Sequence, residues 1–257
     1  MTRIVSVHSF RGGTGKSNLT ANLAVAIGLA GKRVGIIDTD IQSPGIHVLF
    51  GLEQATIQHS LNDYLWGKCS IEQAAHELSR QVGGTSSPGV PPGLFLIPSS
   101  LSAGSIARIL REGYDVALLN DGFRALSRAL KLDYLFIDTH PGVNEETLLS
   151  IAISNTLLLI LRPDNQDFLG SAVTIELARR LEVPEMSILL NKVPPGIDHV
   201  ALAQRTASQF DVPVVGVLPL NMEMAHLGSS NIFLLKFPQH PISQELQRVA
   251  RRLLGEE

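Results

Sequence analysis

The 257-residue sequence contains one cysteine, Cys69, so it cannot form an internal disulfide or a cysteine-rich metal site. Long hydrophobic runs are also missing, because the densest, Leu157 to Leu161, is far shorter than the roughly 18 residues of a membrane-spanning helix. The N-terminal residues show no basic segment followed by an apolar stretch and a small-residue cleavage site. These absences predict a protein that works in the reducing cytoplasm.

A large excess of charge of either sign is absent too. With 21 Lys and Arg against 24 Asp and Glu, the formal net charge is −3. This balance argues against a surface that is basic throughout, but it leaves room for a local basic patch. The 44% hydrophobic and 18% charged residues are typical of a globular protein. We expect a single domain over residues 1–257, since α/β domains often reach this length.

Short apolar segments alternate with longer helical patterns along the chain. Such nearly continuous apolar strands are buried on both faces, as in a parallel sheet covered by helices. The order predicts an α/β fold with a doubly wound, mostly parallel sheet, in which ligands bind at the carboxyl ends of the strands. The expected strands are Ile4 to Val7, Val34 to Ile37, Leu94 to Ile97, Leu135 to Ile137, Leu157 to Leu161, Ile188 to Leu190 and Val214 to Leu218.

Local signals mark helix ends and one loop. A helix is predicted from Lys16 to Ala30, ending at Gly31. Ser70-Ile71-Glu72-Gln73 has the pattern of a capping box and predicts the start of another helix. The segment at about 80–93 contains a run of Gly, Ser, Thr and Pro, which predicts a mobile surface loop.

A glycine-rich turn lies directly between the first expected strand and the first expected helix, and it reads Phe10-Arg11-Gly12-Gly13-Thr14-Gly15-Lys16-Ser17. Glycines let successive backbone N–H groups converge on an anion, and the start of the helix adds partial positive charge. Lys16 is suited to neutralise the outer phosphates, and the Ser17 hydroxyl is suited to bind Mg²⁺. The turn therefore predicts a nucleoside triphosphate site, although such a turn can also be simple punctuation between a strand and a helix.

Three aspartates follow two of the expected strands at the edge that holds this turn. Asp38 and Asp40 end the strand that begins at Val34, and Asp138 ends the strand that begins at Leu135. Phosphoanhydride hydrolysis needs carboxylates that hold Mg²⁺ and its waters, and a group that orients the attacking water. Taken singly, an aspartate at a strand end is more often a helix cap or a turn residue, but two such strand ends beside a phosphate loop favour the catalytic interpretation.

Together these motifs resemble the MinD/ParA family of P-loop ATPases. The glycine-rich turn is similar to the deviant Walker A motif of that family, with Arg11 in place of its signature lysine. Asp38-x-Asp40-x-Gln42 resembles switch I, and Asp138-Thr139-His140-Pro141-Gly142 resembles the Walker B and switch II segment. The resemblance covers nearly the whole chain, from Ile4 to about Gly255.

The resemblance implies roles for these residues. Asp40 corresponds to the aspartate that positions the hydrolytic water, and Asp38 and Asp138 to those that hold Mg²⁺ directly or through its waters. Arg11 corresponds to a lysine that reaches the partner's phosphates in an ATP-bound dimer, so it is a candidate arginine finger or a poorly fitting substitute. The expected catalytic set consists of Lys16, Arg11 and Asp40. His140, which stands where the family has Pro or Ala, is interpreted as a loop residue and not as a catalytic group.

Further residues are expected to contact the nucleotide. Asn18 replaces a threonine that touches the α-phosphate in the family, and its amide is able to form the same hydrogen bond. Asn191 ends a strand with an amide suited to a base edge, and in the family this asparagine reads adenine. Pro219 ends a segment similar to the one that packs on the base. Turn capping is the alternative role for Asn191.

As a member of this family, the chain is expected to be a slow, partner-stimulated ATPase with ATP and Mg²⁺ as cofactors. It would form an ATP-dependent homodimer and respond to a stimulating partner or cargo adaptor in positioning or partitioning. Non-specific DNA or a membrane is a possible surface. The candidate DNA contacts are Arg179, Arg180, Arg205 and the terminal arginines Arg248, Arg251 and Arg252, and the amphipathic last helix is interpreted as packing on the core. The alternative is a small-molecule ligase or kinase of the dethiobiotin synthetase-like branch. The nitrogenase iron-protein branch is excluded because its cluster needs more cysteines than one.

Overall fold

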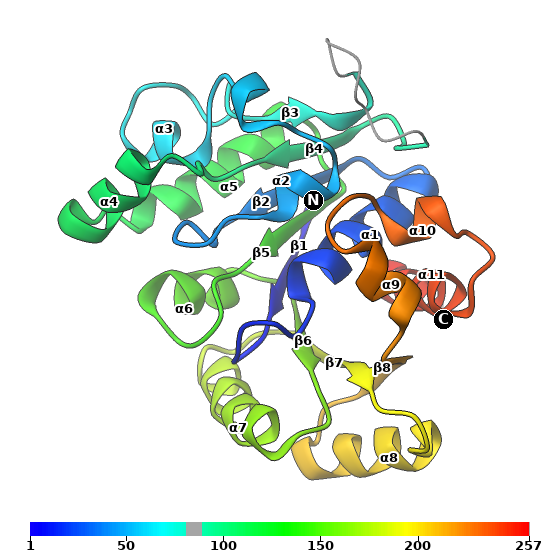
Figure 1. Cartoon of the computed structure of the whole chain (residues 1–257). Helices are drawn as coiled ribbons and strands as arrows, with labels where there is room; N and C mark the ends of the chain where they lie inside the picture. Colours follow the sequence, from blue (N-terminus) through cyan, green and yellow to red (C-terminus); the bar gives the residue numbers. More distant parts are fainter. Residues whose placement is uncertain (81–88, 257) are drawn as a thin grey trace.

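Apolar strands form the centre of the structure, a computed structural model that describes residues 1–80 and 89–256. They make one eight-stranded sheet in the order β3-β4-β2-β5-β1-β6-β7-β8 (Figure 1). Neighbouring strands are parallel except β3 and β4, which are antiparallel. In chain order the strands are β1 (Arg3–His8), β2 (Val34–Asp38), β3 (His76–Glu77), β4 (Leu94–Ile97), β5 (Tyr134–Asp138), β6 (Thr156–Leu161), β7 (Glu185–Val193) and β8 (Val214–Pro219).

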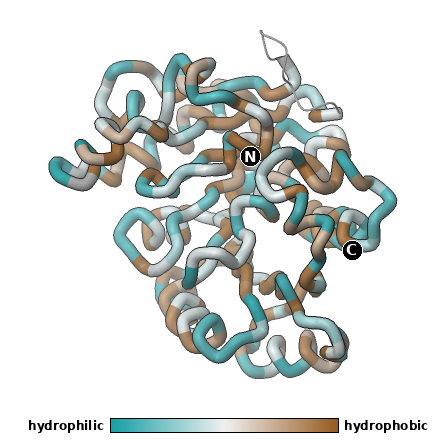
Figure 2. The backbone as a smooth tube through the Cα atoms, viewed as in Figure 1, coloured by the Kyte–Doolittle hydropathy of each residue, from teal (hydrophilic) through white to brown (hydrophobic). Residues whose placement is uncertain are grey.

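Helices cover both faces of this sheet, because side chains alternate between the faces along each strand. On one face, apolar side chains of the strands pack with α1, α2, α10 and α11. On the other face they pack with α3 and α5 at one end and with α7 and α8 at the other. Figure 2 shows the hydrophobic segments concentrated in the central strands. The α-helices are α1 (Lys16–Leu29), α2 (Ile46–Leu49), α3 (Leu61–Leu65), α4 (Ala103–Glu112), α5 (Ala117–Ala129), α6 (Glu145–Ala152), α7 (Asn165–Arg180), α8 (His199–Phe210), α9 (Met222–Leu227), α10 (Phe233–Lys236) and α11 (Pro241–Leu254), with single 3-10 turns at Gln54–Thr56 and Leu78–Arg80.

The doubly wound α/β prediction is therefore confirmed, with all seven expected strands present. The first helix ends at Leu29, and Gly31 follows with a φ of 82°, so its predicted end is confirmed as well. The short strand β3 was not expected from the sequence.

The helix predicted at the capping box is wrong. Ser70 and Gln73 do exchange the expected hydrogen bonds, from Ser70 N to Gln73 Oε1 at 2.8 Å and from Gln73 N to Ser70 Oγ at 3.4 Å. Only a turn follows, because Ile71 and Ala74 are already buried in the core and the chain then pairs with β4 as strand β3. The capping box here closes a turn.

The loop predicted at about 80–93 falls mostly on residues 81–88, which lie outside the described residues. Residues 89–93 turn into β4, and the carbonyl of Gly93 accepts a hydrogen bond from the backbone N–H of Val34 at 3.0 Å.

The last helix, α11, packs its apolar face on the core, as expected. Leu246, Val249, Ala250 and Leu253 are all at most 4% exposed, and they pack in the same cluster as side chains of α1 and β8. Within residues 1–80 and 89–256, no helix is long and apolar enough to cross a membrane.

Candidate nucleotide-binding site

The parallel arrangement of β1, β2 and β5 brings the predicted phosphate loop and aspartates to one edge of the sheet. In the strand ladder Asp138 is the partner of Val7 on one side and of Asp38 on the other. The glycine-rich turn leaves this edge after β1 and runs directly into α1 (Figure 1). Residues more than 100 positions apart in the sequence are therefore neighbours here.

The glycine-rich turn has a backbone that suits glycine. Gly13 and Gly15 have φ values of 78° and 92°, in the left-handed region that side chains disfavour. A Cβ atom on Gly15 would also lie 2.6 Å from Nδ2 of Asn191, which is too close. Gly15 is the residue that precedes α1, so the unpaired N–H groups of the first helical turn face the loop.

Lys16 and Asp138 form a buried ion pair at the centre of the site. Nζ of Lys16 donates to Oδ1 of Asp138 at 2.7 Å, and the side chains are 6% and 1% exposed. The hydroxyl of Thr20 lies 3.1 Å from the same oxygen. The other oxygen, Oδ2 of Asp138, is buried and has no hydrogen-bond partner within the described part of the chain. An uncompensated carboxylate oxygen of this kind is a suitable ligand for a cation.

Asp38 is a fully buried carboxyl beside this pair. Its two oxygens accept hydrogen bonds from the backbone N–H groups of Asp40 at 3.1 Å and Gly45 at 3.2 Å. Burial raises the pKa of Asp38 to about 8, and the neighbouring charge of Asp138 adds to the rise while Lys16 opposes it. A divalent cation would favour the ionised form of Asp38.

The residues present fit Mg²⁺ better than a metal held by protein alone. Across the described ranges, no group of three or more His, Cys, Asp and Glu side chains converges on a common point. Mg²⁺ in phosphate-transfer sites takes one or two carboxylates and completes its shell with phosphates and water. Asp138, Asp38 and the hydroxyl of the partly exposed Ser17 offer such a set.

Asp40 is joined to the other switch-like segment by His140. Nδ1 of His140 lies 2.6 Å from Oδ1 of Asp40, and the two side chains are 25% and 12% exposed. The same oxygen of Asp40 accepts from the backbone N–H of Ser43 at 3.2 Å. The segments that follow β2 and β5 are thus connected by a side-chain hydrogen bond beside the phosphate loop.

A cavity of about 360 Å³ opens next to the glycine-rich turn. It is lined by Gly15, Asn18, Asn191 and Pro219, all of which were expected at the nucleotide, together with Met224 of α9. Asn191 is 4% exposed, and its Nδ2 donates to the carbonyl of Thr14 at 2.7 Å. Since an amide nitrogen carries two hydrogens, one hydrogen and the carbonyl oxygen of Asn191 are left for a base edge.

Comparison with known families decides the class of this site. The family model described as the CobQ/CobB/MinD/ParA nucleotide binding domain matches residues 5–234. The chain belongs to this family. Its eight-stranded sheet and glycine-rich turn are therefore the nucleotide-binding fold of the CobQ/CobB/MinD/ParA family.

Relatives within the family carry different names. The chain is 27% identical over 259 residues to an uncharacterised ATP-binding protein of Methanocaldococcus jannaschii, which covers 99% of this chain and 89% of that protein. It is 25% identical to the septum site-determining protein MinD of a Synechocystis species, over all of this chain and 91% of that protein. An iron-sulfur cluster carrier protein of Haemophilus influenzae is 28% identical, over 98% of this chain and 66% of that protein.

Solved structures confirm the fold. MinD in the MinC:MinD cell division complex of Aquifex aeolicus superposes with a TM-score of 0.81 at 19% identity, covering 100% of this chain and 97% of that chain. MinD of Pyrococcus horikoshii, in complex with Mg-ADP, superposes with a TM-score of 0.78 at 20% identity, covering 98% and 96% of the two chains. At these identities the likeness shows the shared fold.

Arg11, which replaces the signature lysine of the MinD/ParA proteins, is exposed on the rim of the site. Its guanidinium donates to the side-chain oxygen of Gln166 at the start of α7. The preceding residue, Phe10, lies against Gly170 of the same helix. The Arg11 side chain is thus held against the start of α7.

Several polar contacts at the site were not anticipated from the sequence. His140 was interpreted as a loop residue, yet it is the hydrogen-bond partner of Asp40. His8 is fully buried at the end of β1, where Nδ1 pairs with the hydroxyl of Thr139 at 2.8 Å, and burial lowers the pKa of His8 to about 3. The signal that was available is position, since His140 lies within a segment already assigned to the site and His8 lies two residues before the glycine-rich turn.

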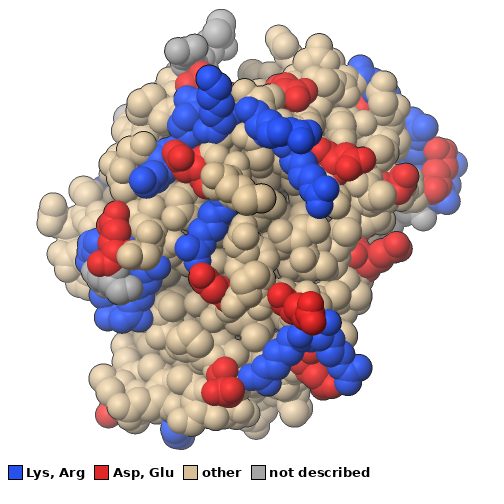
Figure 3. Space-filling model, turned by 180° about the vertical axis from the view of Figure 1, so that it is seen from behind, with Lys and Arg blue, Asp and Glu red and all other residues tan. Residues whose placement is uncertain are grey.

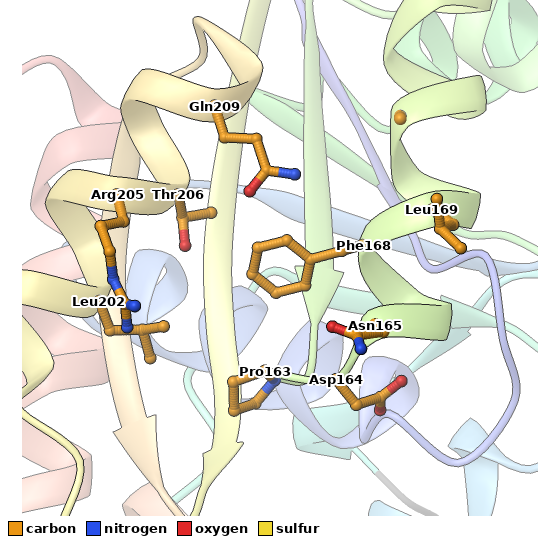
Figure 4. A pocket seen from close by; sticks show the side chains of 10 residues that line it. Pro163, Asp164, Asn165, Phe168, Leu169, Leu202, Arg205, Thr206 and Gln209 are labelled. Carbon is orange, nitrogen blue, oxygen red and sulfur yellow. The ribbon is translucent and has the colours of Figure 1, made fainter.

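A larger cavity, of about 520 Å³, lies between α7 and α8 and is lined by none of the residues expected at the nucleotide or the metal. Figure 4 shows the ring of Phe168 pointing into it from α7, with Arg205, Thr206 and Gln209 on the α8 side and Pro163 and Asp164 at the end of β6. It lacks a glycine-rich turn and paired carboxyls, so cavity size does not identify the nucleotide site in this family member.

Proposed function

We propose that this CobQ/CobB/MinD/ParA family member is an ATPase that binds Mg-ATP at the edge of β1, β2 and β5, dimerises on ATP and hydrolyses it as a switch. The observation that carries the proposal is the buried Lys16–Asp138 pair, whose free carboxylate oxygen lies beside Asp38 and the glycine-rich turn. A cation and a phosphate chain would satisfy these groups together. A purely structural ion pair would not need an unpartnered oxygen.

Each part of the site has a task in this proposal. Backbone N–H groups of the turn bind the phosphates, and Lys16 moves its charge from Asp138 toward them. Bound Mg²⁺ would supply charge neutralisation at the phosphates, held by Ser17, Asp38 and Asp138. Asp40 accepts a hydrogen bond from the attacking water and orients it. The nucleotide-binding set is Arg11, Gly12, Gly13, Thr14, Gly15, Lys16, Ser17, Asn18, Asn191 and Pro219.

The switch function rests on the family. In this proposal two ATP-bound copies pair through the site, Arg11 reaches the partner's phosphates, and hydrolysis is slow until a stimulating partner or cargo adaptor binds. The role would be spatial positioning or partitioning of a cargo in the cytoplasm, at the nucleoid or at a membrane. The names of the MinD relatives and the MinC:MinD complex support a partner-dependent role of this kind.

Iron-sulfur carriage, the role named for another relative, is disfavoured by composition. A cluster is held by several cysteine thiolates, and the sequence contains only Cys69. Cys69 is partly buried, and burial raises its pKa, which makes it a poorer thiolate ligand.

Size-exclusion chromatography of the wild-type chain and Asp40→Ala, each without nucleotide, with ADP and with Mg-ATP, tests the proposal. We expect Asp40→Ala to form a stable dimer only with Mg-ATP, because it binds ATP without orienting the hydrolytic water. Wild type should dimerise transiently and release phosphate. Monomers under all conditions, with ATP bound, would favour the ligase or kinase alternative, for which an acceptor substrate must then be sought.

A further inference from the structure

Lys192 has a strained backbone inside a strand. Its φ is 55°, in the left-handed region that a lysine adopts at a cost. The pairing of β7 with β8 is irregular at this point, between Leu190 and Val193. Because of this irregularity, the side chain of Lys192 does not follow the regular alternation of side chains between the two faces of the sheet.

Comparison with the other strained residues sets Lys192 apart. Among the described residues, the other non-glycine positions with positive φ are Lys131, Glu182 and Asp211. All three lie at or just after the C-terminal end of a helix, where a left-handed residue is a common way to end the helix. Lys192 has no such explanation, and strain of this kind is retained where it serves a site.

The side chains of Lys192 and its neighbour bind the backbone of the glycine-rich turn. Nζ of Lys192 donates to the carbonyl of Gly13 at 2.7 Å, and Nδ2 of the preceding Asn191 donates to the carbonyl of Thr14 at 2.7 Å. Two consecutive side chains of β7 therefore hold two consecutive carbonyls of the turn. The Lys192 side chain also lines the cavity beside Gly15 and Asn18.

Holding these carbonyls determines where the N–H groups point. In a planar trans peptide the N–H is directed opposite to the C=O of the same unit. With the carbonyls of Gly13 and Thr14 drawn toward β7, the N–H groups of Thr14 and Gly15 are directed to the opposite side of the loop. Those are the donors that a phosphate chain requires in this motif.

We propose that Lys192 is a positioning residue, which clamps the Gly13 carbonyl so that the glycine-rich turn is preorganised for the phosphates of a nucleotide. The inference rests on the proposed ATP site and adds to it a residue outside the motifs. Its strain is maintained because the turn of the backbone is what brings Nζ over the loop. Preorganisation of this kind raises affinity by reducing the ordering that binding requires.

Four variants test this role. Lys192→Met removes the donor and keeps the stem, Lys192→Arg keeps a donor, and Lys192→Gly removes both the side chain and the strain. Lys131→Gly is the matched control, because it makes the same substitution at an exposed lysine with a φ of 50° at the end of α5. Calorimetry measures the affinity for Mg-ATP and, by displacement, for adenosine, and thermal unfolding is recorded without nucleotide.

We expect Lys192→Met to weaken Mg-ATP binding about tenfold or more, as the loss of a hydrogen bond from a charged donor does, while adenosine binding and the unfolding temperature stay at wild-type values. Lys192→Arg should recover much of the affinity. Lys192→Gly should unfold at the same or a higher temperature than wild type and still bind Mg-ATP weakly. Lys131→Gly should raise or preserve stability and bind Mg-ATP as wild type does.

The inference is overturned if Lys192→Met and Lys192→Gly bind Mg-ATP as tightly as wild type does, a result that leaves the proposed function intact. It is also overturned if Lys192→Met lowers the unfolding temperature and weakens ATP and adenosine alike, because the lysine then serves the fold. Failure of the wild-type chain to bind Mg-ATP would instead contradict the proposed function itself.

Discussion

At the scale of one residue, Asp38 shows how a site residue lowers the stability of the folded protein. Its carboxyl is fully buried beside that of Asp138, and burial raises its pKa from 3.8 to about 8. The folded chain therefore retains a proton that the unfolded chain has lost over this pH range. Stability from Asp38 is fully present below about pH 3.8 and is lost as the pH rises through about 8.

Replacing Asp38 by Asn should stabilise the nucleotide-free protein at neutral pH and above, because a neutral amide removes the cost of keeping this buried carboxyl protonated. We expect this gain to exceed the loss of one of the two oxygens that accept from backbone N–H groups. We expect the variant to unfold at a higher temperature than wild type, with a difference that widens as the pH is raised from about 5 to about 8. The same substitution should weaken Mg-ATP binding. Thermal unfolding across this pH range and calorimetry are the measurements.

His8 titrates in the opposite sense, so the comparison uses the difference between variant and wild type. Burial lowers the pKa of His8 from 6.5 to about 3, which gives stability that is present above about pH 6.5 and lost on acidification. This contribution is common to both proteins and cancels in the difference. A difference between Asp38→Asn and wild type that is constant with pH would contradict the shifted pKa of Asp38.

At the scale of elements, the contact between the glycine-rich turn and α7 controls the position of the turn. Phe10 lies against Gly170, and a Cβ atom at Gly170 would overlap the Phe10 ring. Gly170→Ala should therefore displace Phe10, destabilise the protein by about 1–3 kcal/mol and weaken Mg-ATP binding. Chemical denaturation and calorimetry measure the two effects.

Gly104→Ala in α4 is the control for this prediction. A Cβ atom there meets nothing closer than the Ser102 hydroxyl at 3.7 Å. In an open helical position, alanine should raise stability by up to about 1 kcal/mol and leave ATP binding unchanged. Equal effects of the two substitutions would show that Phe10 does not depend on Gly170.

Helix α11 provides a second prediction at this scale, because its apolar face could serve either the core or a membrane. Leu246 is completely buried, so Leu246→Ala should reduce the free energy of unfolding by about 2–4 kcal/mol. Gln244→Ala on the exposed side of the same helix should change it little. An unchanged unfolding free energy in Leu246→Ala would mean that the helix is free to leave the core for a lipid surface.

Elements were predictable where their signal is local. Strand β6 is marked by the continuous apolar run from Leu157 to Leu161, and the glycine-rich turn is recognisable from its residues between a strand and a helix. Strand β3 has only two residues and exists through pairing with β4, so no periodicity announces it. The capping box at Ser70 shows the converse, since its hydrogen bonds form without the helix that they usually start.

The arrangement of the site was also predictable only where its signal is local in the sequence. Lys16, Asp38 and Asp138 were predictable because strand ends and the glycine-rich turn place them at one edge. The contacts of His140 with Asp40 and of Lys192 with Gly13 were not, since each depends on how segments about 100 or more positions apart approach in space. The φ of Lys192 in particular comes from an irregularity of strand pairing that no residue type encodes.

At the scale of the whole molecule, the charge distribution bears on the surface that the protein uses. On the face shown in Figure 3, acidic groups lie beside many of the basic ones. Of the candidate DNA contacts, Arg180 pairs with Glu176, and Arg179 donates to the carbonyl of Phe210. Both interactions reduce what these arginines offer to phosphates in a single copy. The single domain expected over residues 1–257 stays a prediction, as does a DNA-binding patch.

Assembly is where Arg11 should show its role. In one copy its guanidinium is exposed and held by Gln166 on α7, so it adds little to the ATP site of its own chain. In the proposed ATP-bound dimer the guanidinium leaves Gln166 and binds the phosphates of the partner's nucleotide. A charged, desolvated guanidinium there contributes strongly to the free energy of dimerisation. Arg11→Ala should therefore bind Mg-ATP nearly as wild type does but dimerise more weakly by about 2 kcal/mol or more, roughly thirtyfold in the dissociation constant.

Sedimentation velocity with Mg-ATP in the Asp40→Ala background measures this, since hydrolysis is then suppressed. Gln166→Ala is the control: it releases Arg11 from α7 without removing the guanidinium, so the dimer should be as stable as in Asp40→Ala alone, or more stable. An intact dimer in Arg11→Ala would contradict the proposed role. If Arg11→Ala and Gln166→Ala weaken the dimer equally, the contact between Arg11 and α7 is itself what supports the interface. The arginine would then act by fixing the turn to that helix and not by reaching into the second copy.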